Sequence, residues 1–141
     1  MPIETVPVLP QPEPGLTPET LIARAAALRP LLREQQEESD ARGRYSDEVH
    51  EALRRGGFYR ILQPRMFGGY EFDIPTFYRM GLELARGCPS TAWNVGNLGC
   101  HHWLLAYYEP ETQHEVWEAD PDVLFRSHHR LAHQWDRRAA V

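Results

Sequence analysis

The residues best suited to chemistry lie in one apolar stretch, residues 89–108. Trp93, Asn97 and His101 follow one another at intervals of four residues, so in a helix each is rotated by only ~40° from the one before. They would therefore share one broad face, with Trp93 and His101 ~12 Å apart along the axis. His102 is adjacent but ~100° around the helix, so at most one of the two histidines points to that face.

An imidazole on such a face could move a proton at neutral pH. Its ordinary pKa lies near neutrality, which suits a general acid or base. Burying His101 without a partner would cost ~1–3 kcal/mol, so the side chain must either face a cavity or be hydrogen-bonded within the core. Trp93 could likewise be an ordinary core tryptophan. The residues alone leave both alternatives open at each position.

Other catalytic and metal-binding patterns are missing. Cys88, Cys100 and the neighbouring histidines lack the spacing of zinc ligands. His128, His129 and His133 have no ligand of another type beside them, so we expect no metal site. The sequence also lacks a nucleophile elbow, a phosphate loop and a dinucleotide fingerprint. Phosphate groups of a flavin or a dinucleotide would therefore have no obvious cradle in this chain.

Composition predicts one globular domain. The chain has 141 residues, of which 42% are hydrophobic, enough to bury a core. The formal net charge of −5 argues against a nucleic-acid partner. With no run of 18 apolar residues and no signal-peptide pattern, we expect no membrane segment. We expect a soluble cytoplasmic protein, and for that compartment we expect no disulfide between the two cysteines.

The elements that must position the face of Trp93, Asn97 and His101 are all predicted to be helices. Residues 1–15 carry five of the 12 prolines and are expected to be a disordered arm. Thr17 caps a helix that Pro30 should kink or split, because proline lacks a donor. Ser46 caps a second helix, which Gly56 and Gly57 end with left-handed geometry.

Three more helices are expected further along. Residues 58–63 are predicted to be extended, and residues 64–75 to form a loop. Asp73 should cap the third helix, which ends before Gly87. The fourth, 89–108, is apolar nearly all round, as in helices buried on several sides. A short fifth helix starts at residue 110. We therefore expect an all-α domain of five to six helices.

Several motifs resemble one known family in the same order. They are Pro64-Arg65-Met66-Phe67-Gly68-Gly69-Tyr70, then Ala85-Arg86-Gly87-Cys88, then Pro89-Ser90-Thr91-Ala92-Trp93. This order is similar to the N-terminal helical domain of acyl-CoA dehydrogenase-like flavoproteins, and within them to two-component flavin-dependent aromatic hydroxylases. The resemblance covers residues 16–125.

The resemblance implies an activity. A hydroxylase of this kind inserts oxygen into an aromatic or polycyclic substrate through a flavin hydroperoxide, using reduced FMN or FAD from a separate flavin reductase. It implies that Trp93 walls the flavin pocket and that His101 contacts and activates the phenol. It also implies four residues on the substrate side: Phe67, Tyr70, Asn97 and His102. For Phe67 the alternative is that the ring simply fills the core.

The tail, residues 126–141, departs from the resemblance, because relatives continue there into a β domain and a C-terminal helical bundle. One back-translation from His128, read one base later, gives Ile-Ile-Ala-Ser-His-Thr-Ser-Gly-Thr-Ala, which resembles the start of that β domain. The two explanations are a frameshifted or truncated reading frame and a dedicated short protein with its own tail.

The sequence also allows two other functions. The chain could be the N-terminal domain of a true acyl-CoA dehydrogenase, or a non-catalytic helical fragment or interaction module. In relatives the β domain and the bundle cover part of the apolar helix 89–108. Without them, an exposed patch should favour self-association, so we expect a homo-oligomer.

Overall fold

Seven α-helical segments and one short 3-10 helix form the described part of the chain, residues 10–124, in a computed structural model. No strand occurs between residues 10 and 124, which confirms the all-α prediction. The elements are α1 (Pro18–Ala27), α2 (Arg29–Glu34), α3 (Gln36–Arg42), α4 (Asp47–Gly56), η1 (Phe58–Arg60), α5 (Ile74–Ala85), α6 (Pro89–Leu105) and α7 (Pro110–Trp117).

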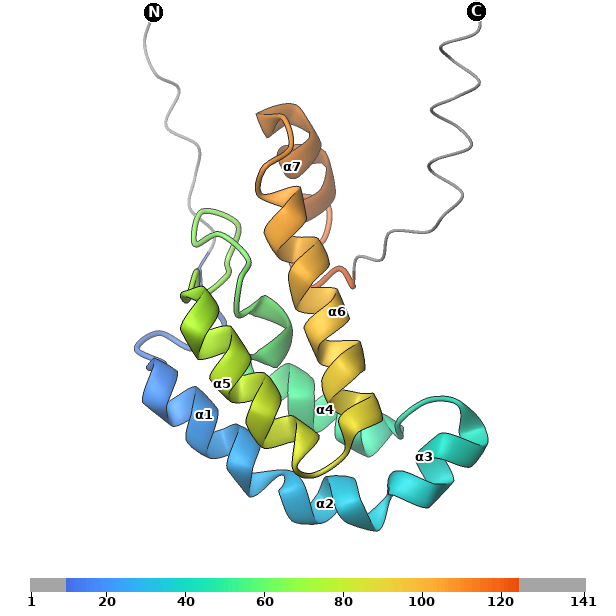
Figure 1. The fold of residues 1–141 in the computed structure, drawn as a ribbon. Helices are drawn as coiled ribbons and strands as arrows, with labels where there is room; N and C mark the ends of the chain where they lie inside the picture. Colours follow the sequence, from blue (N-terminus) through green and yellow to red (C-terminus); the bar gives the residue numbers. More distant parts are fainter. Residues whose placement is uncertain (1–9, 125–141) are drawn as a thin grey trace, which may run out of the picture.

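The first predicted helix is split into three pieces, which raises the count above the five to six expected. The first break, at Leu28, precedes Pro30, which occupies the first turn of α2, where its missing N–H costs no hydrogen bond. A second break lies at Gln35, between α2 and α3. Figure 1 shows the three segments bending around one end of the molecule.

The helix starts are those that the sequence predicts. Side-chain oxygens of Thr17, Ser46 and Asp73 accept hydrogen bonds from backbone N–H groups in the first turns of α1, α4 and α5. Each bond satisfies a donor that the helix itself cannot use. Gly57 ends α4 with φ of 86°, in the left-handed region that favours glycine.

The prediction that residues 58–63 are extended is wrong. The chain turns there through η1, because Gly57 reverses its direction directly after α4. The loop then folds back, so that the N–H groups of Tyr70 and Phe72 donate to the carbonyl oxygens of Arg60 and Ile61. Helix α6 also ends three residues earlier than predicted, at Leu105 rather than residue 108.

The main core lies between α1, α5 and α6, with α5 in the middle (Figure 1). Helices α5 and α6 approach closely where Gly99 meets Phe77. A Cβ added at Gly99 would lie 2.6 Å from the Phe77 ring. A second, smaller core joins α6 to α7 and to the loop before α5, through Phe67, Leu105 and Trp117.

The described end of the proline-rich arm lies against the body of the protein. The Gln11 amide donates to the carbonyl oxygen of Gly69 at 3.0 Å, and Glu13 pairs with Arg24 at 2.7 Å. Residues 1–9 and the predicted divergent tail, 126–141, lie outside the described residues. Disorder of the arm and a frameshift in the tail stay predictions.

Candidate functional site

Helix α6 has one buried face and one exposed face. The buried side chains are those of Thr91, Val95, Leu98, His102 and Leu105. On the opposite face Trp93 is 74% exposed, although it is one of the largest apolar residues in the chain. The prediction that this helix is buried on several sides is therefore wrong for the described residues, because no described element covers its outer face.

Of the three residues predicted to share one face, Trp93 and Asn97 lie in a groove there, whereas His101 does not line that groove. With Cys100 and the α5 residues Tyr78 and Leu82, these two line a groove of about 400 Å3. A volume of this size is typical of small-molecule sites. Most of the groove is apolar, and the Asn97 amide is one of its few polar groups. The groove could hold a flat apolar ring and orient it by one hydrogen bond.

His101 and His102 use Nδ1 in opposite ways. Nδ1 of His101 lies 2.7 Å from the carbonyl oxygen of Asn97. A carbonyl only accepts, so Nδ1 of His101 donates. The indole N–H of Trp117 lies 3.2 Å from Nδ1 of His102, and an indole only donates. Nδ1 of His102 therefore accepts, and its proton is on Nε2.

The two side chains also differ in burial. His102 is 1% exposed and stacks against the Trp117 ring at 6.0 Å. Burial lowers the pKa of His102 to about 4, and the Val123 backbone opposes only part of this shift. His102 is thus a neutral core histidine that ties α6 to α7. His102 faces away from the groove, and the substrate role predicted for it stays a prediction.

Phe67 and Tyr70 are not brought to the groove. Phe67 is buried in the smaller core, where its ring packs 4.9 Å from that of Trp117. Tyr70 is buried in the main core and stacks on Phe72. The position of Phe67 agrees with the core-filling alternative. Substrate contact by either residue stays a prediction.

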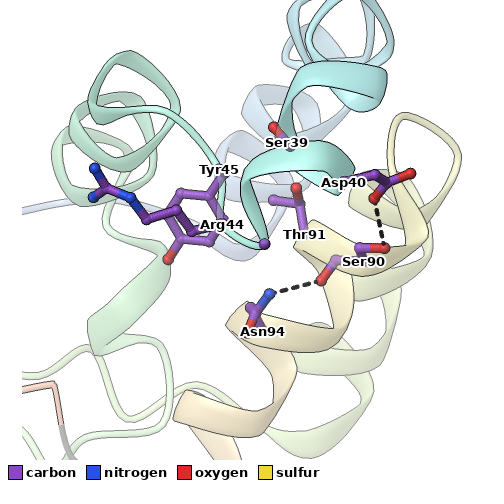
Figure 2. Close-up of a pocket in the computed structure, with 8 residues that line it drawn as sticks. Ser39, Asp40, Arg44, Tyr45, Ser90, Thr91 and Asn94 are labelled. Carbon is purple, nitrogen blue, oxygen red and sulfur yellow. Dashed lines mark hydrogen bonds between the residues drawn. The ribbon is translucent and has the colours of Figure 1, made fainter.

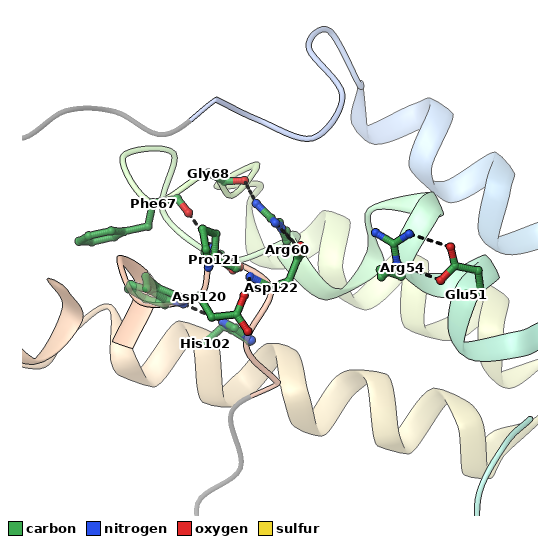
Figure 3. Close-up of polar contacts among 11 residues, drawn as sticks. Glu51, Arg54, Arg60, Phe67, Gly68, His102, Asp120, Pro121 and Asp122 are labelled. Atoms are coloured by element: carbon green, nitrogen blue, oxygen red, sulfur yellow. Dashed lines mark hydrogen bonds and ion pairs between the residues drawn. The ribbon is translucent and has the colours of Figure 1, made fainter. Parts of the chain in front are cut away.

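The loop that carries Phe67 is held by a set of polar contacts (Figure 3). The Gln63 amide donates to the carbonyl oxygens of Phe67 at 2.7 Å and Pro121 at 3.0 Å. Arg60 donates to Asp122 at 2.8 Å and to the carbonyl oxygen of Gly68 at 3.1 Å. The loop and the segment after α7 therefore form one connected unit beside His102.

Two further hollows lie near the groove. One, of about 550 Å3, separates the loop from α6 and is bordered by Met66, Trp103 and Tyr107. The other is polar, lies between α3 and the start of α6, and includes Asp40 and Ser90 (Figure 2). Its volume is about 190 Å3, below the range usual for ligand pockets.

The α5 residues that line the groove were not predicted from the sequence. Tyr78 and Leu82 are both more than 60% exposed. Their spacing of four residues on a helix was a usable signal, because it places two large apolar residues on one face. Among residues 10–124 no group of three or more acidic, histidine or cysteine residues could hold a metal. No helix there is long and apolar enough to span a membrane.

Comparison with known proteins identifies the family of this chain. Residues 22–119 match the model of the acyl-CoA dehydrogenase N-terminal domain. The chain is 39% identical to the oxygenase subunit HsaA, a flavin-dependent monooxygenase of Rhodococcus jostii, over 74% of this chain and 27% of that protein. It is 34% identical to the oxygenase component of a resorcinol hydroxylase of a Rhizobium species, over 82% and 28% of the two chains.

Solved structures show the same similarity. The crystal structure of 3-HSA hydroxylase from Rhodococcus matches with a TM-score of 0.70 at 38% identity, over 74% of this chain and 27% of that one. The chain thus spans little more than a quarter of the length of these relatives. Because the family model matches more than half of the sequence, this chain belongs to the acyl-CoA dehydrogenase N-terminal domain family.

Proposed function

We propose that residues 16–125 act as the N-terminal helical domain of the oxygenase component of a two-component flavin-dependent monooxygenase. Its substrate would be a phenol or a polycyclic aromatic compound, and a separate reductase would supply the reduced flavin. The relatives named above are flavin-dependent oxygenases of this kind. The observation that carries the proposal is the exposed, uncharged face of α6, with Trp93 and Asn97 in an apolar groove.

The described residues fit one wall of a flavin ring site. Trp93 offers a flat apolar surface, and α6 contains no Asp, Glu, Lys or Arg that a ring system would have to desolvate. No phosphate-binding loop accompanies this wall among residues 10–124, so other residues must hold the flavin phosphates. Reduced flavin, when bound, would supply the electrons that activate dioxygen, from which one oxygen atom enters the product and the other leaves as water. FMN and FAD are both compatible with the wall.

In this proposal His101 removes the phenolic proton. The bond from Nδ1 to the Asn97 carbonyl fixes the orientation of the imidazole ring on α6. An oriented imidazole is a suitable general base near neutral pH. Loss of the proton makes the phenol ring more electron-rich and therefore a better nucleophile toward the transferred oxygen. Asn97 lies one turn before His101 and would orient the substrate by its side-chain amide.

A true acyl-CoA dehydrogenase is the alternative within the same family. The apolar groove would also accept an acyl chain, since few polar groups line it. The identities to oxygenases and the Trp93–His101 pair favour hydroxylation.

The experiment is a chimera. Residues 22–119 replace the aligned segment of the Rhodococcus jostii oxygenase subunit, and the protein receives reduced flavin, oxygen and the substrate of that subunit. We expect hydroxylated product well above the background of free flavin. The matched control replaces the same segment with that of an acyl-CoA dehydrogenase. A folded chimera that makes no product but oxidises acyl-CoA would contradict the proposal.

A further inference from the structure

The larger of the two further hollows lies between the loop before α5 and the end of α6, and its volume is about 550 Å3. One wall comes from residues 62–74, and the other comes from the end of α6, the turn after it and α7. Both walls belong to this chain, so the hollow does not depend on a further domain. Its volume is typical of small-molecule sites. It is called the loop hollow below.

Two aromatic rings stand on the α6 side of the loop hollow. Trp103 lies near the end of α6 and Tyr107 lies in the turn that follows. Their ring centroids are 5.2 Å apart and the ring planes are inclined by 79°. Two rings at nearly a right angle can offer their faces to one group placed between them. The face of an aromatic ring is electron-rich and attracts a cation within ~6 Å of its centre.

The turn that carries Tyr107 is fixed by hydrogen bonds. The N–H of Tyr107 donates to the carbonyl oxygen of Leu104 at 3.0 Å. The Gln113 side-chain amide donates to the carbonyl oxygens of Ala106 and Tyr108, at 3.1 and 2.8 Å. The backbone on both sides of Tyr107 is therefore held in place, which lowers the ordering cost of binding a ligand.

Two carboxylates stand on the loop side of the loop hollow, those of Glu71 and Asp73. Oε2 of Glu71 accepts the N–H of Arg65 at 2.9 Å, which leaves Oε1 for another donor. Hydrogen bonds from the side chain and the backbone N–H of Thr76 hold the pKa of Asp73 below its ordinary value. The Asp73 carboxylate therefore stays charged at neutral pH.

The charges of the loop hollow select the sign of a ligand. None of the described residues that line it is Lys, Arg or His, so an anion would meet two negative charges and no positive one. The remaining lining is largely apolar and includes Leu62, Met66 and Ile74. A ligand that fits both features carries a positive charge on an apolar body.

We propose that the loop hollow binds a small organic cation, in which an ammonium group is attached to an aromatic or aliphatic body. The ammonium group lies between the faces of Trp103 and Tyr107 and the carboxylate of Glu71, and the body packs against Met66. The inference rests on the loop hollow and not on the proposed function, because the groove beside Trp93 is lined by other residues.

The first test compares two ligands of the same shape and different charge. Phenethylammonium and its neutral analogue phenethyl alcohol are titrated into the 141-residue chain by isothermal titration calorimetry, at low and at high salt. The ammonium should bind ~10-fold more tightly than the alcohol, because only the cation gains from the ring faces and the carboxylates. This advantage should shrink at high salt. Equal affinities, or no binding of the ammonium at millimolar concentration, would overturn the proposal.

The second test locates the site with matched variants, each checked for its helix content by circular dichroism. Trp103→Leu should weaken binding of the ammonium ~5-fold through loss of a ring face, whereas Trp93→Leu, outside the loop hollow, should leave it unchanged. Glu71→Gln should weaken it ~3-fold, and the control Glu34→Gln, at an exposed position on α2, should have no effect. The proposal is wrong if Trp93→Leu has as large an effect as Trp103→Leu, or if Glu71→Gln has none.

Discussion

Acid should destabilise this domain through one buried histidine. Burial lowers the pKa of His102 from 6.5 to about 4 in the folded state. Between these two pH values the unfolded chain binds more protons than the folded chain, so stability falls as the pH is lowered. The stabilisation that comes from keeping His102 neutral is fully present above pH 6.5. About 3 kcal/mol of it is lost by pH 4, at ~1.4 kcal/mol for each pH unit.

The assay is urea unfolding at a series of pH values between 4 and 7, for the wild type and for His102→Asn. Asparagine retains an oxygen that can accept the indole N–H of Trp117 but does not titrate. The free energy of unfolding of the wild type should drop by about 3 kcal/mol more than that of the variant across this range. Equal pH dependence in the two proteins would refute the assignment of His102 as a neutral core residue.

Four further substitutions test the packing, the loop and a helix cap. Trp117→Ala should cost ~3–5 kcal/mol in urea unfolding, because it empties the smaller core, and a loss below 1 kcal/mol would contradict that core. Gly69→Ala should abolish or severely weaken folding, since its Cβ would lie 1.9 Å from the Gln63 carbonyl oxygen. The matched control, Gly81→Ala, has open space around its Cβ and should raise thermal stability. A reversed order of those two melting temperatures would refute the loop geometry. Asp73→Ala should cost ~1 kcal/mol through loss of the α5 cap, and an unchanged denaturation midpoint would disprove that role.

Local signals in the sequence were enough to predict most helix boundaries. Thr17, Ser46 and Asp73 act on backbone donors within three residues, so their effect does not depend on distant parts of the chain. Pro30 acts equally locally, by lacking an N–H. The order of the loop and helix motifs also predicted the family. The prediction of extended structure for residues 58–63 was wrong, because the chain reverses its direction at Gly57.

Burial at the candidate site could not be predicted in the same way. Helix α6 is apolar nearly all round, so its sequence does not say which face meets α5 and α7. That choice follows from the close approach of Gly99 to Phe77 and from the contact of His102 with Trp117. The direction of Phe67 depends on how Gln63 ties the loop to the segment after α7. These are contacts between distant parts of the chain.

The central claim is that the outer face of α6 is the reactive wall and that His101 is its base. The most direct measurement is the yield of hydroxylated product for each oxygen consumed by the chimera, with His101→Ala and His102→Asn compared. We predict that His101→Ala lowers the yield ~10²-fold, while oxygen consumption continues and ends in hydrogen peroxide. His102→Asn should retain the yield and change only stability. An unchanged yield in His101→Ala would contradict the account.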